Sequence, residues 1–306
     1  MYRSLCCVLA SLAILSAPMW ARTEPSPDSN SPKPLIVCST TQIADFTRQV
    51  VGDDCTTACI LGPGADPHTY MPTPGDAKLA MRADLCIQNG LHLEGKNWMD
   101  TLARDAGRPI VTATEGVKPL VLEDRGTKVN DPHAWFSPRN AAVYVNNITG
   151  AVSKLVPAKK RRFESRAKLY LQQLRVLDSW IREQFNPIPP ARRILVTSHD
   201  AFNYFAGQYG FKNRAPVGWS TGSEVGAGMT PERRRLVIES IQKFGVKAVF
   251  VETSVNPKLV REIARDAGVK IGGYLYSDSM GEEDSAGETY IGMMRENVLT
   301  INAALK

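Results

Sequence analysis

Short apolar runs alternate with helical patterns along most of this 306-residue chain. The apolar runs lie at 35–38, 59–61, 85–88, 110–112, 194–197, 248–252 and 270–276. Segments with helical periodicity separate them, at 42–51, 74–81, 98–106, 201–209, 231–244, 257–267 and 289–304. A strand, a helix and a further strand in this order form a crossover unit on a parallel sheet. The sequence therefore predicts an α/β fold with parallel sheets, built from one group of β-α units in each half.

One uninterrupted amphipathic segment, 158–186, lies between the two halves. Its apolar residues recur at the spacings of three and four that mark one helix face, and they are Phe163, Ala167, Tyr170, Leu174, Leu177 and Ile181. A helix of about 29 residues extends roughly 43 Å, which is enough to run along two domains and join them. The alternative is a coiled-coil dimer arm, which a stripe of barely four heptads disfavours. We predict a long, rigid linking helix.

The first residues have the pattern of a secretory signal peptide. One basic residue, Arg3, precedes an apolar run at 5–17. That run is shorter than the ~20 apolar residues of a transmembrane helix. Cys6 and Cys7 precede most of the run, whereas the cysteine of a bacterial lipoprotein would follow it. We therefore expect residues 1–21 to be removed and the mature protein to be periplasmic, without a lipid anchor.

These patterns together predict a domain organisation. After the signal peptide at 1–21, residues 22–34 are rich in Pro and Ser and lack apolar periodicity, which is typical of a flexible leader. We then predict an N-terminal α/β domain at 35–157, the linking helix at 158–186 and a C-terminal α/β domain at 190–306.

The chain is mildly basic, with a formal net charge of +6. Basic clusters at 159–162 and 233–235 stand at the starts of predicted helices. Such clusters are typical of solvated helix faces, whereas a nucleic-acid surface would be larger and interleaved with aromatic residues. We therefore expect no nucleic-acid binding. We also expect the protein to be a monomer.

Four cysteines follow the predicted signal peptide: Cys38, Cys55, Cys59 and Cys86. An exported chain meets an oxidising compartment, where disulfides form. Cys38 and Cys86 lie in apolar, strand-like runs, where a free thiol packs as a small hydrophobic group. The sequence leaves the pairing open.

The tripeptide Asp-Pro-His occurs twice, at 66–68 and 131–133, and contains two of the four histidines. Proline has a fixed φ angle and pushes the residue before it into an extended conformation, so each histidine leaves a stiff segment at a set angle. A ligating imidazole usually donates its second ring N–H to a carboxylate or a carbonyl, and an aspartate stands two residues upstream in both tripeptides. His199 likewise has Asp200 beside it. The repetition indicates a metal site.

Three of the candidate ligands follow predicted strands, namely His68, His199 and Asp278, and His133 lies in a loop. Ligands of open α/β sheets collect at the carboxyl ends of strands. Because two of these residues come from each half, we expect the site in the cleft between the domains. Three imidazoles and one carboxylate suit Zn²⁺, with Mn²⁺ and Fe²⁺ as alternatives.

Six spaced motifs occur in order along the chain. They are Gly-Pro-Gly-Ala-Asp-Pro-His at 62–68, Asn-Gly-Leu-His-Leu-Glu at 89–94, Asp-Pro-His-Ala-Trp-Phe at 131–136, Val-Thr-Ser-His-Asp-Ala-Phe at 196–202, Ser-Thr-Gly-Ser-Glu at 220–224 and Leu-Tyr-Ser-Asp-Ser-Met at 275–280. With these motifs the chain resembles the TroA-like family, the periplasmic zinc- and manganese-binding components of metal-ion ABC transporters. The resemblance covers nearly the whole chain.

This resemblance implies a function and a ligand set. It implies two α/β domains bridged by a rigid helix, a transported divalent cation, a membrane permease as partner, and metal ligands at His68, His133, His199 and Asp278. His92 matches a family position that is not a ligand. Asp66, Asp131 and Asp200 are the candidates for supporting the ligands, and Glu224, in a segment that resembles the cleft-facing loop of the family, is a weaker one.

The resemblance also bears on the choice of metal. Manganese-preferring members of the family tend to carry Glu where this chain has His199, so a third imidazole favours zinc. Many zinc-specific members carry a long loop rich in His and acidic residues, whereas the matching region here, 123–130, is short and contains no His. Zinc is therefore modestly favoured, and manganese and iron stay open.

Two other functions compete with transport. A zinc hydrolase needs an open position for water, but Asp278 would close the coordination shell, and the chain contains no His-Glu-x-x-His motif. We therefore expect no enzyme activity and no catalytic cofactor. The second alternative is a surface adhesin of the same fold, which the intact ligand set disfavours. A deletion strain starved for zinc or manganese separates transport from adhesion, because only transport predicts rescue by excess metal.

Overall fold

The computed structural model describes residues 32–124, 127–216 and 230–306. Residues 33–306 form one compact unit. The predicted signal peptide, most of the leader and the motif at 220–224 with Glu224 lie outside the described residues.

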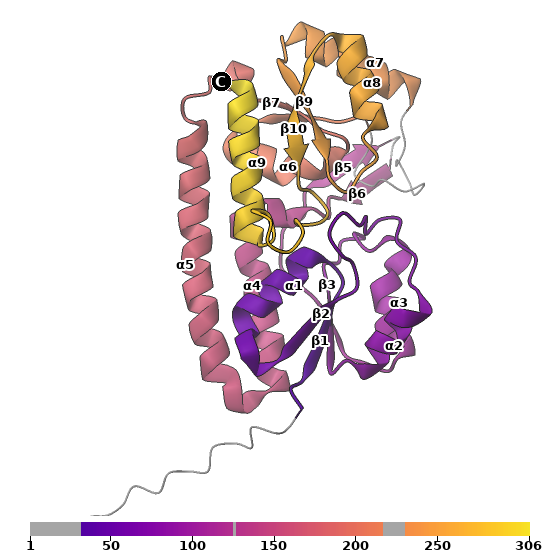
Figure 1. Cartoon of the computed structure of the whole chain (residues 1–306), viewed down its shortest axis with the longest axis vertical. Helices are drawn as coiled ribbons and strands as arrows, with labels where there is room; N and C mark the ends of the chain where they lie inside the picture. The colour runs from indigo at the N-terminus through magenta and orange to yellow at the C-terminus, as the bar shows by residue number, and fades with distance from the viewer. Residues whose placement is uncertain (1–31, 125–126, 217–229) are drawn as a thin grey trace, which may run out of the picture. The chain divides into compact units, whose positions relative to one another are not determined.

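The first half contains a four-stranded parallel sheet in the order β2-β1-β3-β4 (Figure 1). Its strands are β1 (Leu35–Cys38), β2 (Thr56–Cys59), β3 (Leu85–Gln88) and β4 (Ile110–Thr112), and the helices between them are α1 (Thr41–Val51), α2 (Pro74–Arg82) and α3 (Trp98–Asp105). Alternate residues of β1 face opposite sides, because Ile36 and Cys38 join one core cluster and Val37 joins another. The predicted parallel sheet is confirmed.

Local sequence fixes where α2 begins. Thr73 precedes the helix, and its hydroxyl accepts a hydrogen bond from Asp76 N at 3.3 Å. The Asp76 carboxylate in turn accepts from Thr73 N at 2.7 Å. This reciprocal capping satisfies backbone groups that a helix start leaves unpaired, and Pro74 fits the first turn, where no donor is needed.

Two elements of the first half were not predicted. An antiparallel hairpin forms from β5 (Val121–Asp124) and β6 (Thr127–Asn130), and α4 (Pro138–Leu155) follows it. The hydroxyl of Ser137 caps α4 by accepting from Asn140 N at 3.4 Å. The hairpin ends directly before the second Asp-Pro-His tripeptide, so it determines where that tripeptide stands.

The linking helix is α5 (Lys160–Phe185), and its 26 residues lie within the predicted range. The predicted apolar stripe is buried, and Phe185 extends it by one further turn. The stripe packs on α1, α4 and α9 (Tyr290–Leu305), and Figure 1 shows α5 alongside α4 and α9. One straight element therefore contacts parts of both halves, as predicted for a linking helix.

The second half contains two pairs of parallel strands. β7 (Ile194–Val196) pairs with β8 (Lys212–Arg214), and β9 (Ala248–Glu252) pairs with β10 (Lys270–Leu275). The helices here are α6 (Asn203–Tyr209), α7 (Pro231–Lys243) and α8 (Lys258–Ala267), in addition to α9. Among the described residues, none of the helices has the length and apolar character to cross a membrane.

Aromatic residues join the first and last helices in one core. The ring of Phe46 on α1 lies 5.6 Å from that of Tyr144 on α4 and 4.8 Å from that of Tyr290 on α9. Tyr290 N donates to the buried Asp45 carboxylate at 3.0 Å, and its hydroxyl donates to Trp135 O at 2.6 Å. The two halves thus share apolar contacts, and the domain boundaries at 35–157 and 190–306 stay predictions.

The four cysteines that follow the leader are free thiols. Cys38 and Cys59 are in-register partners on neighbouring strands, and Cys38 is fully buried. Burial raises the pKa of the Cys38 thiol to about 12, so it packs as an unreactive apolar group.

Candidate metal site

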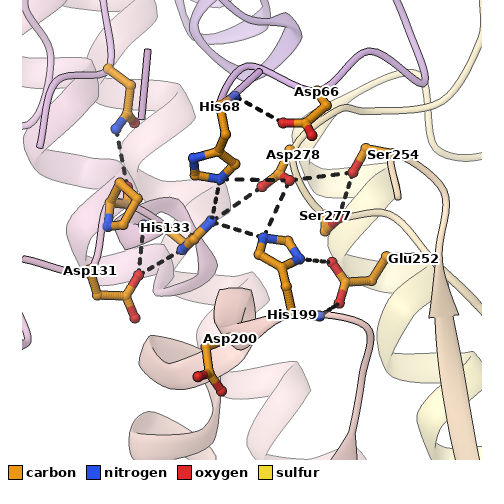
Figure 2. Close-up of polar contacts among 12 residues, drawn as sticks. Asp66, His68, Asp131, His133, His199, Asp200, Glu252, Ser254, Ser277 and Asp278 are labelled. Atoms are coloured by element: carbon orange, nitrogen blue, oxygen red, sulfur yellow. Dashed lines mark hydrogen bonds and ion pairs between the residues drawn. The ribbon is translucent and has the colours of Figure 1, made fainter. Parts of the chain in front are cut away.

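The side chains of His68, His133, His199 and Asp278 converge on one point (Figure 2). One ligand atom from each lies within 4.8 Å of the others. Nε2 of His133 stands 3.2 Å from Nε2 of His68 and 3.2 Å from Nε2 of His199. The Asp278 carboxylate places Oδ1 3.3 Å from His133 Nε2 and Oδ2 3.3 Å from His199 Nε2. The structure therefore brings together all four candidate ligands.

These separations suit one small cation. Zinc binds imidazole nitrogen at about 2.0–2.1 Å, so two ligands at the tetrahedral angle stand about 3.3 Å apart. Four of the separations are 3.2–3.3 Å, and that between His68 Nε2 and Asp278 Oδ2 is 3.9 Å. Both Asp278 oxygens face imidazoles, so the carboxylate can contribute one oxygen or two. The arrangement can hold an ion with four or five protein donor atoms.

Each of these residues follows the end of a strand or hairpin. His68 lies in the loop after β2, His133 stands three residues after β6, and His199 stands three residues after β7. Asp278 stands three residues after β10. The carboxyl ends of parallel strands collect ligands in open α/β sheets, and the antiparallel hairpin β5–β6 brings His133 to the same place.

In both Asp-Pro-His tripeptides the aspartate folds back over the histidine. Asp66 Oδ1 accepts from His68 N at 2.9 Å, and Asp131 Oδ1 accepts from His133 N at 3.0 Å. Asp131 Oδ1 also lies 2.7 Å from His133 Nδ1. A carboxylate at this position holds the proton on Nδ1, which leaves Nε2 as a lone-pair donor toward the cluster.

The carboxylate beside His199 comes from Glu252, which sequence reasoning missed. Glu252 Oε2 lies 2.6 Å from His199 Nδ1, while Oε1 accepts from Ser198 N at 2.8 Å and His199 N at 2.9 Å. Asp200, the predicted partner, is half-buried and points away from the cluster in Figure 2. Glu252 ends the apolar strand β9, so the strand-end rule that selected Asp278 also applied to it.

Asp278 is supported by two serines and by α1. Ser254 Oγ donates to Asp278 Oδ2 at 3.4 Å and lies 2.9 Å from Ser277 Oγ. The carbonyl of Ser277 accepts from Gln42 Nε2 at 3.0 Å. The segment that carries Asp278 is therefore tied to the first turn of α1, close to the first strand of the chain.

The remaining histidine, His92, lies on the surface, outside this cluster. Its φ angle is +65°. Since its side chain is exposed, it serves as an internal comparison for the three clustered histidines.

Burial and carboxylates act on the cluster in opposite directions. His133 and His199 have no exposed surface, and Asp278 is 1 % exposed. Burial lowers the pKa of His68 to about 3. Burial also acts to lower the pKa of His199, but Glu252 and Asp278 outweigh it and raise that pKa well above its ordinary value. The two carboxylates therefore favour a positive charge at His199, so a proton on this imidazole would compete with a cation for the ring nitrogen.

Nearly the whole chain, residues 36–304, matches the family model ZnuA, described as zinc-uptake complex component A periplasmic. The chain belongs to this family. One relative, the manganese-binding lipoprotein MntA of Bacillus subtilis, is 39 % identical over 279 residues, which are 89 % of each chain. Another, the zinc-binding protein TroA of Treponema pallidum, is 37 % identical over 282 residues, again 89 % of each chain.

A solved structure agrees with these relatives. The periplasmic zinc-binding protein TroA from Treponema pallidum matches with a TM-score of 0.82 and 37 % identity, covering 89 % of this chain and 99 % of that one. The predicted family, the α/β fold with a parallel sheet and the long helix are thereby confirmed. The names of MntA and TroA specify different metals at nearly equal identity, so identity does not rank the metals for this chain.

Proposed function

We propose that this protein is the solute-binding component of an ABC transporter for a divalent transition-metal cation, which it delivers to a membrane permease. The observation that carries the proposal is the buried cluster of three imidazoles and one carboxylate at separations that suit a single ion. In this proposal His68, His133, His199 and Asp278 are the ligands.

Binding then requires no chemical step. Each imidazole contributes a neutral Nε2, and the carboxylates of Asp131 and Glu252 hold the Nδ1 protons of His133 and His199 in place. Four protein donors complete a tetrahedral shell, which leaves no position for the activated water that a zinc hydrolase needs. We therefore propose capture and release of the ion instead of catalysis.

Zinc ranks first among the cations in this proposal. Imidazole nitrogen suits zinc, and the separations of 3.2–3.3 Å suit its bond lengths. Mn²⁺ and Fe²⁺ follow, because Asp278 can offer a second oxygen to an ion that takes more than four donors.

Export and docking complete the proposal. The protein functions in the periplasm as a monomer after removal of residues 1–21, and the loaded form docks on the permease. Because α5 contacts helices of both halves, loading produces a small tilt instead of a wide hinge motion. The permease then recognises a docking surface that differs between the loaded and the empty protein.

The first test measures metal content. Mature protein is stripped with chelator, offered equimolar Zn²⁺, Mn²⁺ and Fe²⁺ under anaerobic conditions, desalted and analysed by mass spectrometry. The wild type should retain one ion per chain, and the double variant His68→Ala/His199→Ala should retain none. His92→Asn is the matched control, because it removes an exposed imidazole outside the cluster at a left-handed backbone position that asparagine tolerates. Equal retention in the wild type and the double variant would overturn the site.

A further inference from the structure

The segment 89–98, which we term the bracing segment, contacts the peptide group directly before His68. Gly95 N donates to Pro67 O at 3.3 Å, and the indole Nε1 of Trp98 donates to the same oxygen at 3.0 Å. The backbones are so close that a Cβ at Gly95 would stand 1.9 Å from the carbonyl oxygen of His68. Only glycine fits there. The bracing segment therefore fixes the backbone that carries His68.

The same segment contacts the peptide group directly before His133. The amide Nδ2 of Asn89 donates to Pro132 O at 3.1 Å. Nδ2 also donates to Gly90 O at 2.8 Å, which orients the amide, and Oδ1 accepts from the hydroxyl of Tyr144 at 2.8 Å. Asn89 has no exposed surface, so water does not substitute for these contacts. In both tripeptides the proline carbonyl is thus a hydrogen-bond acceptor for one shared segment.

Glu94 makes the bracing segment rigid between these two contacts. Its carboxylate accepts from Asn89 N at 2.7 Å, from Gly90 N at 3.0 Å and from the Ser39 hydroxyl at 2.6 Å. Glu94 is 2 % exposed. A buried carboxylate with several donors fixes the backbone around it. Asn89 and Gly95 are therefore parts of one small rigid body.

The backbone of the bracing segment also adopts an uncommon conformation. Leu91, His92, Lys96 and Asn97 have φ angles between +54° and +65°, and the remaining described non-glycine residue with a positive φ is Asp284. Left-handed backbone is unfavourable for such residues and persists where surrounding contacts impose it, often at functional sites. Among the described residues, left-handed backbone at non-glycine positions is therefore concentrated in the segment that contacts both proline carbonyls.

We infer that the bracing segment sets the separation between His68 and His133, and that Asn89 and Trp98 are positioning residues for the bound ion. The inference rests on the proposed metal-binding function. The two Nε2 atoms stand 3.2 Å apart, and a bound ion keeps its preferred geometry only if its ligands are held to within about 0.5 Å. The stiff Asp-Pro-His tripeptides transmit any shift of the proline peptides to the imidazoles. Neither Asn89 nor Trp98 belongs to the ligand cluster.

The test compares variants that remove different hydrogen bonds of the same buried network. Asn89→Ala removes the donor to Pro132, and Trp98→Phe removes the indole donor to Pro67 while keeping an aromatic ring. Tyr144→Phe is the matched control, because it removes the hydrogen bond to Asn89 Oδ1 and leaves both Nδ2 hydrogen bonds, to Pro132 O and to Gly90 O, intact. For each protein we would measure the Kd for Zn²⁺ and Mn²⁺ by chelator competition, the visible absorption of bound Co²⁺, and the melting temperature of the metal-free form.

We expect Asn89→Ala and Trp98→Phe to weaken zinc binding about 10- to 100-fold, to change the Zn²⁺/Mn²⁺ preference and to shift the Co²⁺ spectrum. Tyr144→Phe should lower the melting temperature and leave the affinity and the spectrum unchanged. If Asn89→Ala does not fold, Trp98→Phe decides alone. The inference would be overturned if the folded variants had the affinity and spectrum of the wild type, or if Tyr144→Phe changed them equally. Either result would leave the proposed metal site standing. A wild type that binds no ion would overturn the proposed function itself.

Discussion

Replacing Glu252 with glutamine tests how the buried carboxylates support the site. Glu252 Oε2 lies 2.6 Å from His199 Nδ1, and Oε1 accepts from Ser198 N and His199 N. Glutamine has the same size and keeps one oxygen for these donors. It lacks the negative charge that makes the imidazole a stronger donor to a cation. The substitution therefore isolates the charge from the packing.

We expect Glu252→Gln to lose zinc affinity by an amount near the upper end of what carboxylate partners of ligating histidines contribute. Removing the partner of a ligating histidine typically weakens metal affinity 10- to 100-fold, which corresponds to about 1.4–2.7 kcal/mol. The side chains of His199 and Glu252 are both 0 % exposed, so solvent neither screens the charge nor replaces it. We therefore expect the zinc Kd of Glu252→Gln to rise about 100-fold.

The loss of zinc affinity in Glu252→Gln should also depend on pH. Glu252 is the largest of the influences that raise the pKa of His199 against burial. Its replacement lowers that pKa, so fewer protons compete with the ion as the pH falls. The difference in affinity between wild type and Glu252→Gln should therefore be larger at pH 8.5 than at pH 6.5.

Zinc competition with a chromophoric chelator at both pH values measures this effect. Glu239→Gln makes the same chemical change on the exposed face of α7, where the carboxylate is 51 % exposed and pairs with Arg235. This control should bind zinc as the wild type does. Glu252→Gln with a Kd within about threefold of wild type at both pH values would refute the role assigned to the carboxylate.

Three further predictions concern protons, stability and thiols. Zinc binding at pH 7 should release at least one proton, because the pKa of His199 is raised. Calorimetry in two buffers of different ionisation enthalpy counts the released protons. Zinc binding without proton release would contradict the assignment of His199 as a ligand. Asp54→Asn should lower the free energy of unfolding by about 1 kcal/mol at pH 7. Burial acts to raise the pKa of Asp54, but Arg166 and neighbouring cations outweigh it and lower that pKa. The stabilisation is therefore present above the ordinary pKa of aspartate and declines as the pH falls through the lower pKa of Asp54 in the folded protein. Urea titrations at several pH values, with Asp53→Asn as the control, would detect this decline. Because the pKa of the Cys38 thiol is raised to about 12, it should resist alkylation at pH 8 in the native protein and react in urea, and equal labelling in both would argue against its burial.

Four strands were predictable because each is a short, mostly apolar run. β1, β3 and β4 have their predicted bounds, as does β9. The hairpin β5–β6 escaped prediction because Val-Leu-Glu-Asp and Thr-Lys-Val-Asn contain few apolar residues. α4 escaped because it is rich in Val and Asn, which have modest helix propensity, and its packing on α5 stabilises it.

The candidate site shows the same division between local and tertiary information. The aspartates of both Asp-Pro-His tripeptides were predictable, because a turn of three residues brings the carboxylate to the histidine N–H. The contact between Glu252 and His199 joins residues 53 positions apart, one at the end of β9 and one in the loop after β7, so adjacency in sequence pointed to Asp200 instead. The bracing segment was beyond sequence reasoning for a related reason, since its hydrogen bonds reach Pro67 and Pro132 only in the folded chain.

The dispersal of the four donors along the chain has a consequence for biogenesis. His68 and His133 belong to the first half, while His199 and Asp278 belong to the second. A nascent or truncated chain therefore holds only part of the set, and two imidazoles on a flexible polypeptide compete poorly with other ligands for an ion. The full set exists only after β10 has joined the sheet and Asp278 has reached its place beside α1. With the proposed ligand set, cells would synthesise this protein without losing metal to unfinished copies, and possession of the ion would mark a chain whose folding is complete.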